Sequence, residues 1–286
     1  MDAEIRARIV EEIEGALSGG ALVVTATVTA GGEPSIAAAG EKMLVRRDGT
    51  RVGTLGDAAL DDVVHEAAVA VFTDIARVAM QTLYFGRDAG GGGHAVTRRS
   101  QAHPGDAEIM LQLFEAPARL VVIGGGHVGL AVATLGAFVG FDITVLDDRE
   151  EFANRERFPM ADAVHAGDTT AALDAMTFDA QDYVVLVSRG HRQDEDALRH
   201  VVGRGAAYVG MIGSRRRTAT VIQHLAEEGL DATALDAVST PIGLDLGAET
   251  PEEIALSILS EIVMLRRGGR GGRMREQRAP IDWPTR

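Results

Sequence analysis

The chain has 286 residues, of which 46% are hydrophobic, and this suffices for two domains with sizeable cores. Its 42 acidic and 28 basic residues give a formal net charge of -14, which argues against a nucleic-acid binder because phosphate contacts need clustered cations. The sequence has no cysteine, which excludes disulfides, a thiolate nucleophile and cysteine-based metal sites. Its acidic start differs from a signal peptide, and its longest uncharged stretch, 128–141, is too short to span a membrane, so we expect a cytoplasmic protein.

The first 116 residues have the pattern of a small α+β domain. Predicted strands cover 22–29, 42–47, 50–55, 79–85 and 108–114, and predicted helices cover 4–17 and 58–71. The second and third strands are joined by Asp48-Gly49, which is typical of a tight hairpin turn. Between the last two strands we expect a polar loop that contains Gly90 to Gly93, His94 and His103.

After Pro117, which is typical of a linker, strands and helices alternate strictly. Predicted strands cover 119–123, 142–147, 162–165, 182–187 and 207–212, and predicted helices cover 127–139, 151–157, 169–176, 194–203, 215–228 and 251–266. This alternation predicts a doubly wound parallel sheet, a Rossmann-like domain over 117–268, with ligands at the carboxyl ends of the strands. Residues 269–286 are predicted to be a flexible basic tail, the other interpretation being a segment that binds an acidic partner or RNA.

The strongest motif is a glycine-rich turn between the first strand and the first helix of this second half. In G-x-G-x-x-G the first glycine permits a tight turn, the second lets the backbone approach a pyrophosphate, and the third lets helix and strand pack closely. The N–H groups that open the helix then face the anion. We therefore predict a dinucleotide site that contains Gly124, Gly125, Gly126, His127 and Gly129. The other interpretation is a glycine turn that binds no ligand.

The residues after the second and third strands leave the identity of the dinucleotide open. Asp147 stands at about the 20-residue offset of the acid that binds a ribose 2′-hydroxyl, as in NAD. Arg149 is instead suited to a 2′-phosphate, as in NADP. Asp168 either reaches the adenosine side of the ligand or caps the helix that follows it.

The segment after the fourth strand is polar and cationic at a place where this fold presents ligands. Ser188 and His191 are predicted to contact the ligand. If the protein is an enzyme, His191 and Asp194 are the candidate catalytic residues. Otherwise His191 is a solvated loop histidine and Asp194 caps the next helix.

Two further segments in the second half carry glycine or arginine where a ligand would explain them. In the first, Gly213 and Ser214 precede three arginines, Arg215, Arg216 and Arg217, and Ser214 is a natural N-cap. The arginines then fill the first helical turn, where the helix macrodipole disfavours cations. Either acidic neighbours or a bound anion must offset their charge.

The other segment is 241–249, which contains Gly243 and Asp245 and whose spaced glycines suggest a loop against a ligand or a partner. It leads into Thr250-Pro251-Glu252-Glu253, a capping box with proline at the first helical position. Local rules account for that helix, but not for the loop before it.

Together these motifs resemble the XdhC/CoxI family, the accessory proteins of xanthine dehydrogenase and related molybdenum hydroxylases. The likeness is densest in 122–129, 208–217 and 241–255, and weaker in 40–56. The resemblance implies a homodimer with a small first domain and a Rossmann domain, which holds the molybdenum cofactor, aids its sulfuration and passes it to the apo-hydroxylase. This chain departs from the family in the loop at 56–58, where the family usually carries a cysteine. The spacing of His65, His94 and His103 predicts no metal site in its place.

Three functions follow as alternatives. The first, from the resemblance, is an accessory protein that binds molybdopterin dinucleotide and aids its maturation and insertion into an apo molybdenum hydroxylase of the xanthine or CO dehydrogenase type. The second, from the fold, is an NAD(P)-dependent oxidoreductase in which His191 exchanges a proton and Arg215 or Arg216 holds an anionic substrate. The third is a nucleotide-sensing regulatory module.

Overall fold

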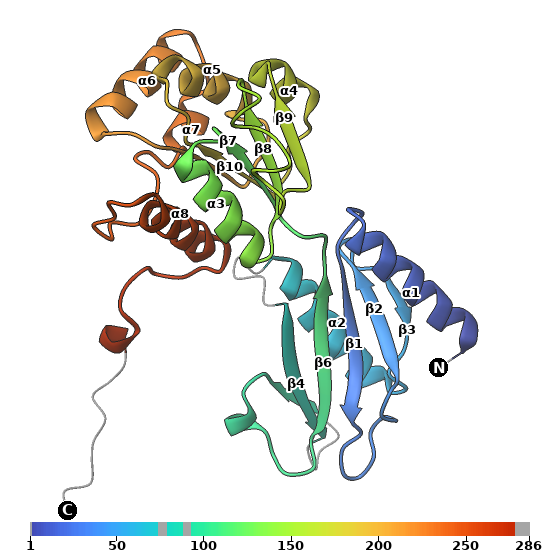
Figure 1. The fold of residues 1–286 in the computed structure, drawn as a ribbon. Coiled ribbons are helices and arrows are strands. Elements are labelled where there is room, and N and C mark those ends of the chain that lie inside the picture. Colours follow the sequence, from blue (N-terminus) through green and yellow to red (C-terminus); the bar gives the residue numbers. More distant parts are fainter. Residues whose placement is uncertain (1, 74–78, 88–92, 278–286) are drawn as a thin grey trace, which may run out of the picture. The chain divides into compact units, whose positions relative to one another are not determined.

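The computed structural model describes residues 2–73, 79–87 and 93–277. The chain forms two compact units, Met1–Ala116 and Pro117–Arg286 (Figure 1). Across the described residues, the helices are too short or too polar to cross a membrane.

The first unit is a six-stranded antiparallel sheet with a helix on each face. Its strand order is β3-β2-β1-β6-β4-β5. The elements are α1 (Ala3–Leu17), β1 (Val23–Ala30), β2 (Lys42–Arg46), β3 (Arg51–Gly53), α2 (Ala58–Thr73), β4 (Met80–Arg87), β5 (Gly93–Val96), the 3-10 helix η1 (Arg99–Gln101) and β6 (Ala107–Phe114). Strand β6 alternates buried and half-buried residues, as expected of a strand with two unlike faces. One face packs on α2 around Phe85, and the other packs on α1 around Leu44.

Strand β5 is absent from the sequence prediction, which places a polar loop there. The four residues of β5 pair with β4, from Tyr84 opposite Val96 to Arg87 opposite Gly93. An edge strand is held by backbone hydrogen bonds and needs no apolar alternation, so its sequence carries little signal. The pairing places His94 beside His103 and Asp106. Part of the glycine run, 90–92, lies outside the described residues.

The second unit has a five-stranded parallel sheet in the order β11-β10-β7-β8-β9. Its strands are β7 (Arg119–Ile123), β8 (Asp142–Asp147), β9 (Ala163–Ala166), β10 (Asp182–Leu186) and β11 (Tyr208–Met211). Its helices are α3 (His127–Phe138), α4 (Thr169–Ala175), α5 (His191–Val201), α6 (Arg215–Glu227), α7 (Ala232–Asp236), α8 (Pro251–Arg266) and the 3-10 helix η2 (Met274–Gln277). This confirms the predicted fold class of a Rossmann-like sheet preceded by a smaller α+β part.

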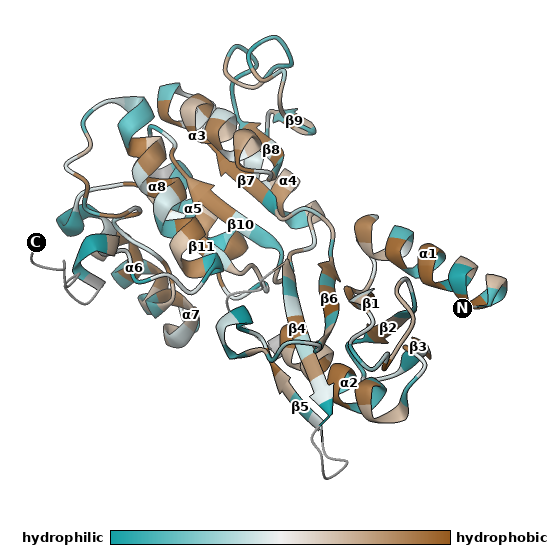
Figure 2. Cartoon of the chain, turned by 90° about the horizontal axis from the view of Figure 1, so that it is seen from below, coloured by the Kyte–Doolittle hydropathy of each residue, from teal (hydrophilic) through white to brown (hydrophobic). Residues whose placement is uncertain are grey.

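Two apolar cores sandwich this parallel sheet. The core that contains Leu120 and Phe158 lies under α3 and α8, and the core that contains Leu186 and Leu225 lies under α5 and α6. The central strands β7 and β10 are therefore buried on both faces and hydrophobic after their first residues, Arg119 and Asp182 (Figure 2). The winding direction reverses between β7 and β10, which makes their carboxyl ends the switch point at which this fold binds ligands.

The predicted helix over 151–157 is wrong, because the segment forms turns. The Asn154 side chain accepts from the Arg157 backbone N–H, and the Arg155 guanidinium donates to the carbonyls of Ala161 and Asp162. Side-chain bonds to the backbone thus replace the helical ladder.

Two further differences from the prediction concern helices α5 and α7. Helix α5 begins at His191 with Gly190 as its N-cap, so Asp194 does not cap it but lies in its first turn. The short helix α7, capped by the Asp231 side chain, is also absent from the prediction.

Candidate functional site

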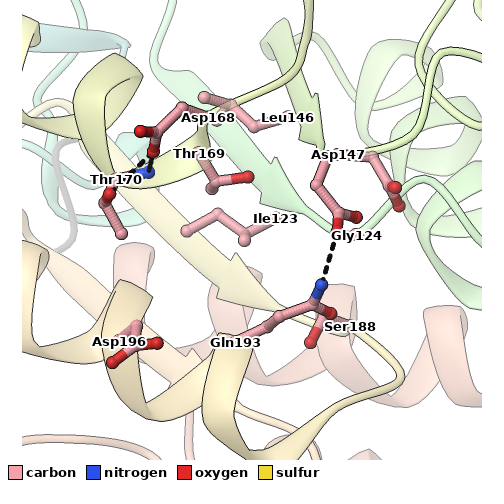
Figure 3. A pocket seen from close by; sticks show the side chains of 11 residues that line it. Ile123, Gly124, Leu146, Asp147, Asp168, Thr169, Thr170, Ser188, Gln193 and Asp196 are labelled. Carbon is pink, nitrogen blue, oxygen red and sulfur yellow. Dashed lines mark hydrogen bonds between the residues drawn. The ribbon is translucent and has the colours of Figure 1, made fainter.

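A cavity of about 270 Å³ lies at the carboxyl ends of β7, β8, β9 and β10 (Figure 3). Its polar lining includes the carboxylates of Asp147, Asp148, Asp168 and Asp196. The Asp168 side chain accepts from the N–H groups of Thr170 and Ala171, so it is also the N-cap of α4, which was one of its two predicted roles. Carboxylates accept hydrogen bonds from hydroxyl and amino groups and repel phosphates, so the cavity favours a neutral, hydroxyl- or amino-bearing part of a ligand.

The glycines of the predicted phosphate loop have three different environments. Gly124 has a φ of 112°, which permits the tight turn after β7. A Cβ on Gly129 would overlap the Gly124 carbonyl oxygen, so this glycine lets α3 pack closely on the strand. A Cβ on Gly126 would meet no atom within 4 Å. Gly126 is the N-cap of α3 and gives its first turn no side-chain hydrogen bond, so the backbone there is open to an anion.

The Asp147 carboxylate accepts hydrogen bonds from the glycine loop and from Arg149. This buried carboxylate accepts from the Gly125 N–H at 2.7 Å and from the Arg149 N–H at 3.0 Å. The Arg149 guanidinium adds bonds from Nε at 2.9 Å and Nη2 at 3.0 Å. Although burial opposes it, hydrogen bonds from Arg149 and Gly125 hold the pKa of Asp147 below its usual value. The two oxygens thus receive four donors, which is the full capacity of a carboxylate.

Three arginines surround the Phe152 ring beside the glycine loop. The guanidinium carbons of Arg149, Arg157 and Arg189 lie 3.9, 5.5 and 5.2 Å from the ring centroid. Arg157 Nε donates to the Gly125 carbonyl at 2.9 Å, whereas its Nη2 is buried without an acceptor among the described residues. Phe152 and Arg157 were not predicted from the sequence, although the arginine and phenylalanine residues that follow the acid-ended strand β8 were a usable signal. Arg189 follows β10, in the polar and cationic segment that was predicted to contact the ligand.

The segment after β10 brings Ser188 and Asp194 together. Ser188 lines the cavity, and its N–H donates to Asp194 Oδ1 at 3.3 Å. Burial raises the pKa of Asp194 to about 6, and only partial relief comes from Ser188 and Arg217. A carboxyl group that titrates near neutrality can exchange protons. The side chain of His191 lies outside the described part of the structure.

None of the arginines at the start of α6 lines the main cavity, and Arg216 and Arg217 line another cavity together with Glu195. Ser214 is the N-cap of α6, as predicted, but its hydroxyl makes no cap hydrogen bond. Ser214 also lines that other cavity, which has a volume of about 400 Å³. Gly213, which precedes them, has a φ of 157°, and Arg215 begins the helix.

The loop before α8 is attached to that helix. The Gly243 N–H donates to Glu261 Oε2 at 3.0 Å, and Ser257 Oγ donates to the Leu244 carbonyl. A Cβ on Gly243, whose φ is 98°, would overlap Ser257 Oγ. The predicted capping box of α8 at Thr250 is present. Gly243 therefore has a packing role, and Asp245 lies in the same loop, outside the lining of the main cavity.

His127 also lies outside the lining of the main cavity. It is exposed at the start of α3 and borders a groove between α3 and α8. Of the predicted site residues, Gly124, Asp147, Asp168 and Ser188 line the main cavity.

A doubly wound parallel sheet with a glycine turn at its switch point defines a Rossmann-type protein. A family model described as the XdhC Rossmann domain matches residues 120–262, and one described as the XdhC and CoxI family matches residues 16–82. The chain belongs to the XdhC/CoxI family.

Two bacterial relatives are similar to the chain in sequence. It is 32% identical over 240 residues to the uncharacterized protein YqeB of Escherichia coli (strain K12), which covers 84% of this chain and 43% of that protein. It is 28% identical over 161 residues to a probable xanthine dehydrogenase subunit of Bacillus subtilis (strain 168), which covers 56% of this chain and 46% of that protein. The chain thus spans less than half the length of these two relatives.

A solved structure shares the fold of the chain. It is that of a xanthine dehydrogenase from Bacillus halodurans, with a TM-score of 0.51 and 19% sequence identity. The match covers 91% of this chain and 96% of that one. At this identity the likeness shows the fold alone.

Proposed function

We propose that the protein is an accessory protein for a molybdenum hydroxylase of the xanthine dehydrogenase type. In this proposal its Rossmann unit binds the molybdopterin dinucleotide form of the molybdenum cofactor and aids its maturation and its insertion into the apo-enzyme. Membership of the XdhC/CoxI family supports the accessory role. The name of the Bacillus subtilis relative, a probable xanthine dehydrogenase subunit, points to the same kind of partner.

The observation that carries the proposal is the division of charge around the glycine loop. The backbone at Gly126 is open, and the arginines around Phe152 lie beside the loop. A pyrophosphate at the loop would accept hydrogen bonds from the backbone N–H groups that open α3 and would lie near these arginines. The carboxylate-lined cavity suits the hydroxyl and amino groups of the attached nucleoside or pterin.

When bound, the cofactor supplies the molybdenum and the dithiolene chemistry of the client enzyme, while this chain binds and orients it. The 286 residues include no cysteine. Any sulfur transferred to the cofactor therefore comes from a donor other than a cysteine of these residues. The predicted homodimer and the cytoplasmic location stay predictions, and sedimentation of the purified chain tests the former.

The Gly126→Ala variant tests the proposed site directly. Alanine fits the extended backbone of Gly126 and meets open space within the protein, so the fold is unchanged, whereas its methyl group occupies the approach path of a pyrophosphate. We expect dinucleotide affinity to fall at least tenfold, about 1.4 kcal/mol. Gly15→Ala is the matched control, since a Cβ on Gly15 of α1 also meets no atom within 4 Å.

Binding is measured by calorimetry with molybdopterin cytosine dinucleotide, NAD(H) and NADP(H) in parallel. The proposal is supported if the pterin dinucleotide binds best and Gly126→Ala alone weakens it. Equal affinities for Gly126→Ala and Gly15→Ala would remove the glycine loop from the site. Tight nicotinamide binding with hydride transfer and no pterin binding would favour the oxidoreductase, for which Asp194, with its pKa raised by burial to about 6, is the proton-exchanging candidate.

A further inference from the structure

Two histidines and one aspartate meet in the first unit, outside the proposed dinucleotide site. One ligand atom from each of His94, His103 and Asp106 lies within 4.8 Å of the other two. His94 Nε2 is 3.0 Å from Asp106 Oδ2, and the two imidazole rings have centroids 4.5 Å apart at an interplanar angle of 60°. Imidazole nitrogens and a carboxylate oxygen are donors that Zn²⁺ and other divalent transition metals prefer.

The sheet brings His94 and Asp106 together across a strand that lacks a side chain at this point. Strand β4 lies between β5 and β6, and Gly86 of β4 stands opposite His94 of β5. On the other side of β4, Phe85 pairs with Ala107 of β6. Because the strands are antiparallel, Asp106, the residue before Ala107, lies beside Gly86, the residue after Phe85. Residues two strands apart are normally about 10 Å apart, too far for such a contact. A Cβ on Gly86 would overlap both Asp106 Oδ1 and His94 Cε1, so this glycine makes the room.

A tight turn supplies the third residue. The Asp106 N–H donates to the His103 carbonyl at 3.2 Å, and Gly105, with a φ of 92°, occupies the turn position that requires positive φ. The His103 N–H donates in return to Asp106 Oδ2 at 2.8 Å. This turn, His103-Pro104-Gly105-Asp106, therefore fixes two of the three residues in one short segment.

The cluster has a buried anionic side and an open side. The Asp106 side chain is only 5% exposed, and that of His94 is 22% exposed. His103 is exposed, which gives an ion a path from solvent.

We propose that His94, His103 and Asp106 bind a divalent transition-metal ion, with Zn²⁺ as the reference ion. The metal takes the place of the proton that His94 Nε2 and Asp106 Oδ2 share at 3.0 Å. Three protein ligands leave a coordination position for water or an external ligand, as in open rather than purely structural zinc sites. The site is independent of the dinucleotide proposal, because every ligand belongs to the first unit.

The experiment titrates Zn²⁺ into tag-free, chelator-treated full-length protein at pH 7.5, by calorimetry. His103→Ala is the main variant because the side chain is exposed and its loss leaves the His94–Asp106 contact in place. His65→Ala is the matched control, since His65 lies in the same unit and contacts the Gly49 carbonyl at 2.7 Å instead. We expect one equivalent of Zn²⁺ to bind to wild type and to His65→Ala, and affinity to fall at least tenfold in His103→Ala and Asp106→Asn.

A further readout keeps the result from resting on a folding defect. Zn²⁺ raises the melting temperature of wild type and His65→Ala but not of His103→Ala, whose metal-free melting curve shows whether it is folded. The proposal is overturned if wild type binds no Zn²⁺ at millimolar concentration, or if folded His103→Ala binds it as tightly as His65→Ala.

Discussion

Replacing Asp194 by asparagine is the sharpest test of the electrostatics at the cavity edge. Burial raises the pKa of this carboxyl from 3.8 to about 6. The folded state thus favours the protonated acid, so Asp194 lowers the free energy of unfolding progressively as pH rises from about 4 to about 6. Two pKa units at about 1.4 kcal/mol each correspond to about 3 kcal/mol of stability that is present in acid and absent above pH 6.

Asparagine at position 194 is neutral at every pH, and its Oδ1 can still accept from the Ser188 N–H. We therefore expect Asp194→Asn to have nearly the stability of wild type at pH 4 and to exceed it by up to about 3 kcal/mol at pH 8. The measurement is urea unfolding at a series of pH values, with the difference between variant and wild type as the quantity of interest. Using that difference cancels the other carboxyl groups, such as Asp147, whose lowered pKa acts in the opposite direction.

Asp196→Asn is the control for the loss of one negative charge, since this residue lies on the same helix with 56% of its side chain exposed. The reasoning is refuted if Asp194→Asn and wild type change in parallel, within about 0.5 kcal/mol, between pH 4 and pH 8. Such a result would mean that the carboxyl is hydrated in solution despite its burial in the structure.

Three stability predictions concern the second unit and are checked by chemical unfolding. Gly129→Ala should destabilise by about 1–3 kcal/mol because its methyl group would overlap the Gly124 carbonyl; no loss would mean that α3 can shift. Tyr208→Phe should lower the free energy of unfolding by about 1–3 kcal/mol, since the hydroxyl donates to the Glu261 carboxylate. An unchanged free energy would mean that water replaces this hydrogen bond without loss. Thr250→Ala removes the side-chain half of the capping box at α8 and should cost about 1 kcal/mol, whereas an unchanged midpoint would show that proline at the next position suffices.

The alternating half of the chain could be predicted because its signals are local. Strand β7 is five apolar-rich residues followed by glycines, and α8 begins with a capping box and proline, so each boundary is encoded within a few residues. Strand β5 could not be found this way, since its partner β4 is what holds it. The turns over 151–157 escaped prediction because the hydrogen bonds that hold them reach beyond the segment. The Arg155 guanidinium, for example, donates to the carbonyl of Asp162.

The candidate sites also differ in whether local signals or tertiary contacts bring their residues together. Gly124 and Asp168 were predictable as cavity residues because they follow strands β7 and β9 in a fold whose ligand edge is known. The cluster of His94, His103 and Asp106 was not, since two of its members meet only across Gly86, and no spacing along the chain records that contact. Tertiary pairing, rather than a motif, creates this cluster.

The pairing of Asp147 with Arg149 changes what the acid at the end of β8 can be expected to do. In the simplest form of the fold this carboxylate binds a ribose 2′-hydroxyl. In this chain its oxygens already accept four hydrogen bonds, three of them from Arg149 and one from Gly125. A ribose hydroxyl must therefore displace a guanidinium donor, which costs a charge-assisted bond. Asp147 is better suited to holding Gly125 and Arg149 in place. The more exposed Asp148 beside it, which lines the same cavity, is then the carboxylate at the end of β8 that is left to accept from a ligand hydroxyl.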